Sequence, residues 1–375
     1  MLVVERVALD ALLDAIRRRG YKLIGPRVRG QAVIFDAIND SRDLPIGVTV
    51  DTAGGEYQLV HTDSPAVFSC VTGPQGLKKH FYPARKLLWR AKGSSSDFRI
   101  ETEPDAPVPC AFIGVRPCDL AALHIQDKIF MEGAHVDPTY RARREQVFIV
   151  AVNCAQPAAT CFCGSMGTGP RAEKPFDLAV TEVIEGEAHY FCVETGSQQG
   201  VDVLRSIPHR EPVAREVVAS EQVIAAARQQ MGREMNTRGI QDLLYRNAEH
   251  PQWEGIARRC LGCANCTLVC PTCFCSTVED VTNLSGDTAE RYRVWDSCYT
   301  MDFSYIHGGS VRKSGSARYR HWITHKLASW HDQFGVSGCV GCGRCIAWCP
   351  VGIDLTEEIA ALRSRAIAGA AWTGD

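Results

Sequence analysis

The sequence lacks any long apolar run and any strong excess of one charge. It has no stretch of about 18 consecutive apolar residues, the length expected of a membrane-spanning helix. Its 41 Lys and Arg residues nearly balance its 43 Asp and Glu residues, so overall charge does not attract nucleic acid or an anionic membrane. The opening residues MLVVERVALDALLDAIRRRGY contain no basic segment followed by an apolar run. We therefore expect a cytoplasmic protein that binds neither nucleic acid nor a membrane.

Common enzyme motifs are missing as well. No G-x-G-x-x-G follows an expected strand, and the chain has neither a P-loop nor a G-x-S-x-G elbow. Dinucleotide binding and serine hydrolase chemistry are therefore not indicated. We expect a chain that is not catalytic by itself.

Cysteine, in contrast, is abundant. The chain has 18 cysteines, and 11 of them lie between Cys260 and Cys349. A disulfide scaffold is typical of small secreted proteins, whereas clustered cysteines in a large intracellular chain more often hold metal or do redox chemistry. The sequence therefore points to metal or redox sites.

Periodicity predicts an α/β domain over residues 1–220 and a mostly α-helical domain over residues 221–375. Leu9, Leu12, Leu13 and Ile16 share one helical face that ends near Gly20. A helical pattern between the last two of four short apolar runs predicts a strand–helix–strand crossover. These runs, which we expect to be strands, cover residues 32–36, 46–50, 111–115 and 147–152.

Two motifs of the form C-x2-C-x2-C-x3-C-P lie in the carboxyl-terminal part. Three thiolates at this spacing bind one 4Fe-4S cluster, and the fourth usually binds the cluster of the other motif. We name the two expected ligand groups set 1, which is Cys260, Cys263, Cys266 and Cys349, and set 2, which is Cys339, Cys342, Cys345 and Cys270. The pattern predicts two 4Fe-4S clusters in a dicluster ferredoxin domain.

Structural zinc is the alternative for these motifs, but zinc sites usually combine separated cysteine pairs. The 68 residues between Cys270 and Cys339 imply a large insertion, or a ferredoxin in which the motifs sit between helices. The insertion contains the basic segment VRKSGSARYRHWITHK. We interpret this segment as counter-charge for the clusters or as a docking surface, and a merely solvated face is the alternative.

The string TCFC occurs twice, at 160–163 and at 272–275. The first copy belongs to a candidate third 4Fe-4S site, the amino-terminal set, because two expected parallel strands end just before Cys118 and Cys154 and would meet at one edge of the sheet. A Gly-rich loop, GSMGTGP at 164–170, follows. The amino-terminal set comprises Cys118, Cys154, Cys161 and Cys163. A thiol redox site centred on Cys118 and simple packing of buried cysteines are the alternatives.

The second copy follows a motif whose ligands are already assigned, so we expect Cys273, Cys275 and Cys298 to be packed thiols or hydrogen-bonding neighbours of sulfur. Asp119 is interpreted as a first-turn helix residue. Three further cysteines are assigned to packing: Cys70, Cys110 and Cys192.

Several segments together resemble the iron–sulfur beta subunit of cytoplasmic sulfhydrogenase-type nickel–iron hydrogenases, and the related A-type subunits of anaerobic sulfite reductases. They are GVRPCDLAAL, NCAQPAATCFCGSMGTGP, CLGCANCTLVCPTCFCSTVED, WDSC, GGSVRKSGSARYRHWITHK and GCVGCGRCIAWCPVGID. The resemblance covers about residues 60–360. It implies an electron relay between a flavoprotein subunit that reacts with NAD(P) and separate catalytic subunits.

The catalytic partners implied by the resemblance are the small and large nickel–iron hydrogenase subunits, or sulfite reductase subunits. This chain has no pair of C-x2-C motifs near both termini that would indicate a nickel–iron centre of its own. A zinc-stabilised binding protein and a stand-alone thiol oxidoreductase remain alternatives from other functional classes.

Overall fold

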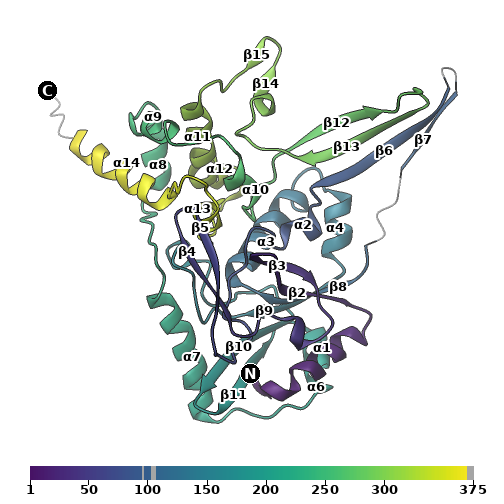
Figure 1. The fold of residues 1–375 in the computed structure, drawn as a ribbon, viewed down its shortest axis with the longest axis vertical. Coiled ribbons are helices and arrows are strands. Elements are labelled where there is room, and N and C mark those ends of the chain that lie inside the picture. Colours follow the sequence, from purple (N-terminus) through teal and green to yellow (C-terminus); the bar gives the residue numbers. More distant parts are fainter. Residues whose placement is uncertain (95–96, 103–106, 370–375) are drawn as a thin grey trace.

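A seven-stranded sheet organises the amino-terminal part of the chain (Figure 1). The computed structural model describes residues 1–94, 97–102 and 107–369. The strand order is β1-β11-β10-β9-β8-β2-β3, with β2, β8, β9 and β10 parallel and with antiparallel pairs at both edges. The strands are β1 (Leu2–Glu5), β2 (Lys22–Arg29), β3 (Ala32–Ala37), β8 (Cys110–Val115), β9 (Val147–Val152), β10 (Leu178–Glu185) and β11 (Ala188–Thr195).

Helices cover both faces of this sheet. On one face, α1 (Leu9–Arg17) and α6 (Gln198–Arg205) bury Leu13, Ile16 and Leu204 against it. The other face contacts α2 (Lys78–Phe81), α3 (Pro117–Phe130) and α4 (Pro138–Arg144) through an aromatic-rich core. Short 3-10 turns, η1 (Arg6–Ala8) and η2 (Ser41–Asp43), and the hairpin of β4 (Val48–Ala53) with β5 (Glu56–His61) complete this part. The α/β architecture is the one predicted.

The predicted crossover is confirmed. Strands β8 and β9 are parallel neighbours, and α3 connects their two ends along the chain before α4. The residues after both strands therefore reach the same edge of the sheet. The predicted first helix is confirmed too, since α1 contains the expected apolar face and Gly20 follows it with φ 89°.

A four-stranded sheet projects away from the rest of the molecule as an arm (Figure 1). Its order is β12-β13-β6-β7, so the insertion between the two cysteine motifs pairs with strands from the amino-terminal part. The strands are β6 (Arg85–Ser94), β7 (Asp97–Glu101), β12 (Ser276–Thr282) and β13 (Thr288–Trp295).

The carboxyl-terminal part surrounds the two motifs with short helices and a second core. That core combines apolar helix faces with Trp253, Tyr319 and Trp322. The helices are α7 (Ala214–Gln229), α8 (Ile240–Arg246), α9 (Gln252–Ala257), α10 (Asn265–Leu268), η3 (Asp302–Ser304), α11 (Gly315–Thr324), η4 (His325–Ser329), α12 (Trp330–Phe334), α13 (Arg344–Ala347) and α14 (Leu355–Gly369).

The description of this part as mostly α-helical is not confirmed. The insertion supplies the β12–β13 hairpin and a small sheet of β14 (Tyr305–Ile306) and β15 (Gly309–Ser310). The sequence pattern does not reveal β12 and β13, because neither strand buries a clear apolar face. The boundary at residue 220 stays a prediction, and helix α7 runs across it. In the described residues, no helix has both the length and the apolar character needed to cross a membrane.

Candidate metal centres

The two cysteine motifs fold into the same local shape. In each, the residues at the third and fifth positions have positive φ, namely Gly262 and Ala264 in the first motif and Gly341 and Gly343 in the second. A one-turn helix follows each loop, α10 or α13. The backbone N–H groups of Gly262 and Gly341 donate to the Sγ atoms of the first cysteines, at 3.4 and 3.5 Å. The loops thus curl around their cysteines and offer N–H groups to sulfur.

The four thiols of set 1 line one apolar cavity. Cys260, Cys263, Cys266 and Cys349 surround it together with Tyr299, Tyr319 and Trp322. The backbone N–H of Ile353 donates to Cys349 Sγ at 3.3 Å. The structure therefore brings the last cysteine of the second motif to the first three of the first motif, as cluster exchange requires.

The thiols of set 2 also gather, with Cys270 arriving from the first motif. Burial raises the pKa of Cys339, Cys342 and Cys345, and the nearby thiol of Cys270 contributes to each shift. A cluster of thiols whose charged forms are disfavoured fits a bound cation, which stabilises thiolates. That these two sets are cluster ligands stays a prediction.

Lys326 supplies buried positive charge to set 2. It lies in η4, a π-helical turn between α11 and α12, and such turns often occur at functional sites. Its Nζ donates to Cys270 Sγ at 3.3 Å, Thr272 Oγ1 at 3.1 Å and the Gly338 carbonyl at 3.0 Å. Burial opposes the charge of Lys326, but the surrounding thiols Cys270, Cys273 and Cys339 raise its pKa well above the usual value.

The amino-terminal set is gathered as well. Cys118, Cys154, Cys161 and Cys163 line one small cavity at the carboxyl edge of β8 and β9. Cys118 stands in the first turn of α3 and Cys163 begins the one-turn helix α5 (Cys163–Met166). The loop closes on itself because the backbone N–H of Cys154 donates to the Pro170 carbonyl at 2.9 Å.

A buried guanidinium accompanies this amino-terminal set. Arg116 Nη1 donates to Cys154 Sγ at 3.1 Å. Burial raises the pKa of Cys118 well above its usual value and that of Cys163 to about 12. A stand-alone thiol catalyst needs a lowered thiol pKa, so these surroundings do not support the redox alternative centred on Cys118.

Asp119 has a role that its position in the sequence did not suggest. Its carboxylate forms a buried two-point ion pair with Arg344 of the second motif, with both N···O distances 2.7 Å. Arg344 Nε also donates to the Thr72 carbonyl at 3.2 Å. Such paired, planar contacts fix geometry, so this pair clamps α3 to the second motif. No local pattern marks such a contact between residues so distant in sequence.

The three sets lie in a row with set 2 in the middle. Cys342 of set 2 also lines the cavity of the amino-terminal set, and Cys345 of set 2 also lines the cavity of set 1. Contacts between backbones support this order, because Phe162 N–H donates to the Gly341 carbonyl at 2.8 Å. The order across the molecule is therefore amino-terminal set, set 2, set 1.

Both copies of TCFC contact the second motif. In the first copy, Phe162 binds Gly341, and a Cβ added at Gly343 would lie 2.2 Å from the Thr160 carbonyl oxygen. In the second copy, Thr272 Oγ1 donates to the Gly338 carbonyl at 2.7 Å. The repeated string therefore packs against the second motif from two places in the chain.

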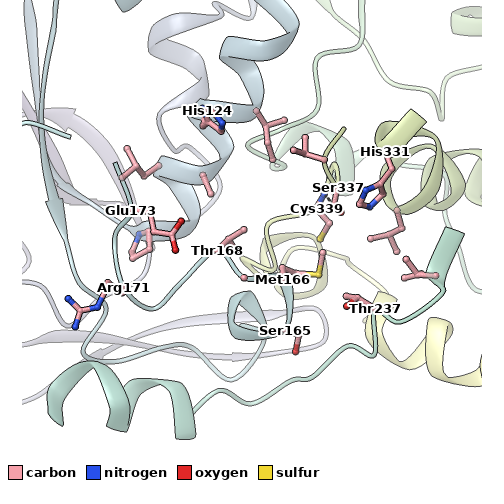
Figure 2. Close-up of a pocket in the computed structure, with 18 of the residues that line it drawn as sticks. His124, Ser165, Met166, Thr168, Arg171, Glu173, Thr237, His331, Ser337 and Cys339 are labelled. Carbon is pink, nitrogen blue, oxygen red and sulfur yellow. Dashed lines mark hydrogen bonds between the residues drawn. The ribbon is translucent and has the colours of Figure 1, made fainter. Parts of the chain in front are cut away.

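A cavity of about 500 Å³ opens next to set 2. Figure 2 shows Cys339 and Met166 facing it between His331 on one side and Arg171 and Glu173 on the other. The cavity is lined by α3, α5, α8 and the segment before Cys339. It gives access from outside to a predicted cluster ligand.

The remaining cysteines lie in packed surroundings. Cys70 and Cys192 are buried and Cys110 is half-buried. Within the described residues, no group of three or more His, Cys, Asp or Glu side chains is arranged to hold a single metal ion.

Comparison with known proteins gives two matches. A family model described as a 4Fe-4S dicluster domain matches residues 259–353. The sulfhydrogenase 2 subunit beta of Pyrococcus furiosus is 31% identical over 297 residues, which cover 76% of this chain and 84% of that protein. No solved structure matches.

Proposed function

Because this chain belongs to the family of sulfhydrogenase beta subunits, we propose that it is the electron-relay subunit of a cytoplasmic, NAD(P)-linked nickel–iron hydrogenase complex. It passes electrons between a flavoprotein subunit that reacts with NAD(P) and the small and large hydrogenase subunits. The matched 4Fe-4S dicluster domain supports iron–sulfur chemistry at sets 1 and 2.

The observation that carries the proposal is the row of three thiol sets. Sharing of Cys342 and Cys345 between neighbouring cavities supports close spacing of the three sites, and close spacing is what successive one-electron transfers need. When bound, the clusters would supply one-electron carriers. The chain's own residues hold them, exclude water and set their charge environment.

The amino-terminal set is proposed as the third 4Fe-4S site of this relay. Four thiols around one cavity, Arg116 on Cys154 and the adjacent second motif support it. Its position at the end of the row makes it a terminal site, open to exchange with one of the partners.

The proposal is tested by reconstitution. The anaerobically purified chain alone should neither oxidise NAD(P)H nor evolve hydrogen, since it lacks nucleotide and nickel motifs. Adding a flavoprotein partner and a catalytic partner should restore electron flow between NAD(P)H and protons. Rapid NAD(P)H oxidation by the chain alone would refute the relay function.

The identity of the complex is tested by the metals that co-purify. A native complex that contains nickel supports the hydrogenase proposal. Siroheme in place of nickel would instead assign the chain to a sulfite reductase complex.

A further inference from the structure

Three cysteines outside the ligand sets lie between sets 1 and 2. They are the two cysteines of the second TCFC string, Cys273 and Cys275, and Cys298 in WDSC. Their thiols form pairs: Cys273 is hydrogen-bonded to the set 2 ligand Cys270, and Cys275 is hydrogen-bonded to Cys298. The second pair contains no predicted cluster ligand.

The backbone holds Cys275 and Cys298 together. Cys275 immediately precedes β12, Cys298 follows β13, and the ladder pairs Ser276 with Trp295. One more hydrogen bond continues this ladder, from Asp296 N–H to the Cys275 carbonyl at 2.9 Å. The pair therefore sits at the base of the projecting arm, where the two strands of the hairpin meet the core.

The Cys298 side of the pair is fastened to set 1. Thr267 Oγ1, next to ligand Cys266, donates to Ser297 Oγ, next to Cys298, at 2.7 Å. Both hydroxyl side chains are buried. Cys298 itself is buried, whereas Cys275 is partly exposed. Neither lines the cavity of set 1 or that of the amino-terminal set.

The Cys275 side faces buried cations near set 2. Lys326 interacts electrostatically with both thiols of the pair. Lys78 Nζ donates to the Cys273 carbonyl at 3.4 Å and lies 4.0 Å from the centre of the Trp295 ring. Positive charge at this position stabilises a thiolate during exchange of electrons.

We propose that Cys275 and Cys298 form a redox-active dithiol that stores an electron pair between the one-electron sites. Oxidation breaks two S–H bonds, forms one S–S bond and releases two protons and two electrons. Iron–sulfur carriers at sets 1 and 2 accept those electrons singly, and the reverse flow reduces the disulfide. The proposal rests on the relay function, and it explains why a close thiol pair lies between two sites that are already complete.

The proposal has a direct chemical readout in the unmodified protein. The anaerobic full-length chain is oxidised with a mild oxidant, its free thiols are alkylated, and peptides are mapped by mass spectrometry. We expect a Cys275–Cys298 disulfide, and we expect both thiols to become alkylated after the clusters are reduced. Two alkylated thiols in both states would refute the pair.

A reductive titration counts the stored electrons. The oxidised wild-type chain should take up two more electrons than Cys298→Ala or Cys275→Ala, with unchanged iron content. Cys192→Ala is the matched control, since Cys192 is also buried but lies in β11, and it should match the wild type in both electron count and iron.

Two results would overturn the proposal. The first is an equal electron count in wild type and variants. The second is iron loss in Cys275→Ala and Cys298→Ala with normal iron in Cys192→Ala, which would make the pair metal ligands. A wild-type chain without iron would instead refute the relay function, so the two failures are distinguishable.

Discussion

Lys326 is a buried cation hydrogen-bonded directly to a predicted cluster ligand, Cys270. Reduction adds negative charge to an iron–sulfur cluster, and hydrogen bonds to its sulfurs and nearby charge favour the reduced form. The residue therefore has a defined electrostatic task at set 2.

Replacing this lysine by methionine removes the charge while keeping an unbranched side chain. We expect Lys326→Met to lower the potential of the set 2 cluster by roughly 60 mV, which for one electron is a tenfold change in equilibrium. Lys313→Met is the control, because Lys313 belongs to the same basic segment but is exposed. A redox titration followed by low-temperature electron spin resonance measures both, and an unchanged or higher potential for Lys326→Met would contradict this role.

The amino-terminal thiols give a second prediction for single residues. Cys118→Ser or Cys154→Ser should remove one cluster's worth of iron, about four atoms per chain, because these thiols line the amino-terminal cavity. The double substitution Cys273→Ser with Cys275→Ser should remove none. Unchanged iron and unchanged spin-resonance signals in the amino-terminal variants would show that this set holds no cluster.

Among the structural elements, the two motif loops form a matched pair with different neighbours. Gly262 and Gly341 occupy equivalent positions, with φ 65° and 64°. A Cβ on Gly262 would meet nothing within 4 Å, whereas one on Gly341 would lie 2.6 Å from the backbone nitrogen of Cys163. The second loop thus depends on glycine for contact with the amino-terminal set.

This difference predicts unequal effects of the same substitution. Gly262→Ala should destabilise the protein by about 1 kcal/mol, the cost of a left-handed backbone for a residue with Cβ. Gly341→Ala should cost about 3 kcal/mol, because overpacking adds to that strain. Anaerobic thermal unfolding measures both, and equal unfolding midpoints would contradict the tight contact.

The same elements show what a sequence can and cannot predict. The β8–α3–β9 crossover was predictable, because its apolar runs and helical spacing are local and parallel connections have one hand. The pairing of β13 with β6 was not, since it joins segments far apart in the chain with weak apolar patterns. The Asp119–Arg344 ion pair and the contact of Cys275 with Cys298 escaped for the same reason.

On the scale of the whole molecule, the sheet and the carboxyl-terminal helices hold three thiol sets in one row. The carboxyl edge of the parallel strands supplies one end of the row, and the exchanged cysteines of the two motifs supply the middle and the other end. The arm extends from the base where Cys275 and Cys298 meet (Figure 1). The fold therefore places the redox sites at the junction of its parts.

The central claim, that this row is an iron–sulfur relay, is tested most directly by metal and sulfide analysis of the anaerobically purified full-length chain. Three cubane sites predict about twelve iron atoms and about twelve sulfides per chain, with little zinc. About eight of each would remove the amino-terminal site and leave the relay with two. Mainly zinc, with little iron and no acid-labile sulfide, would contradict the account.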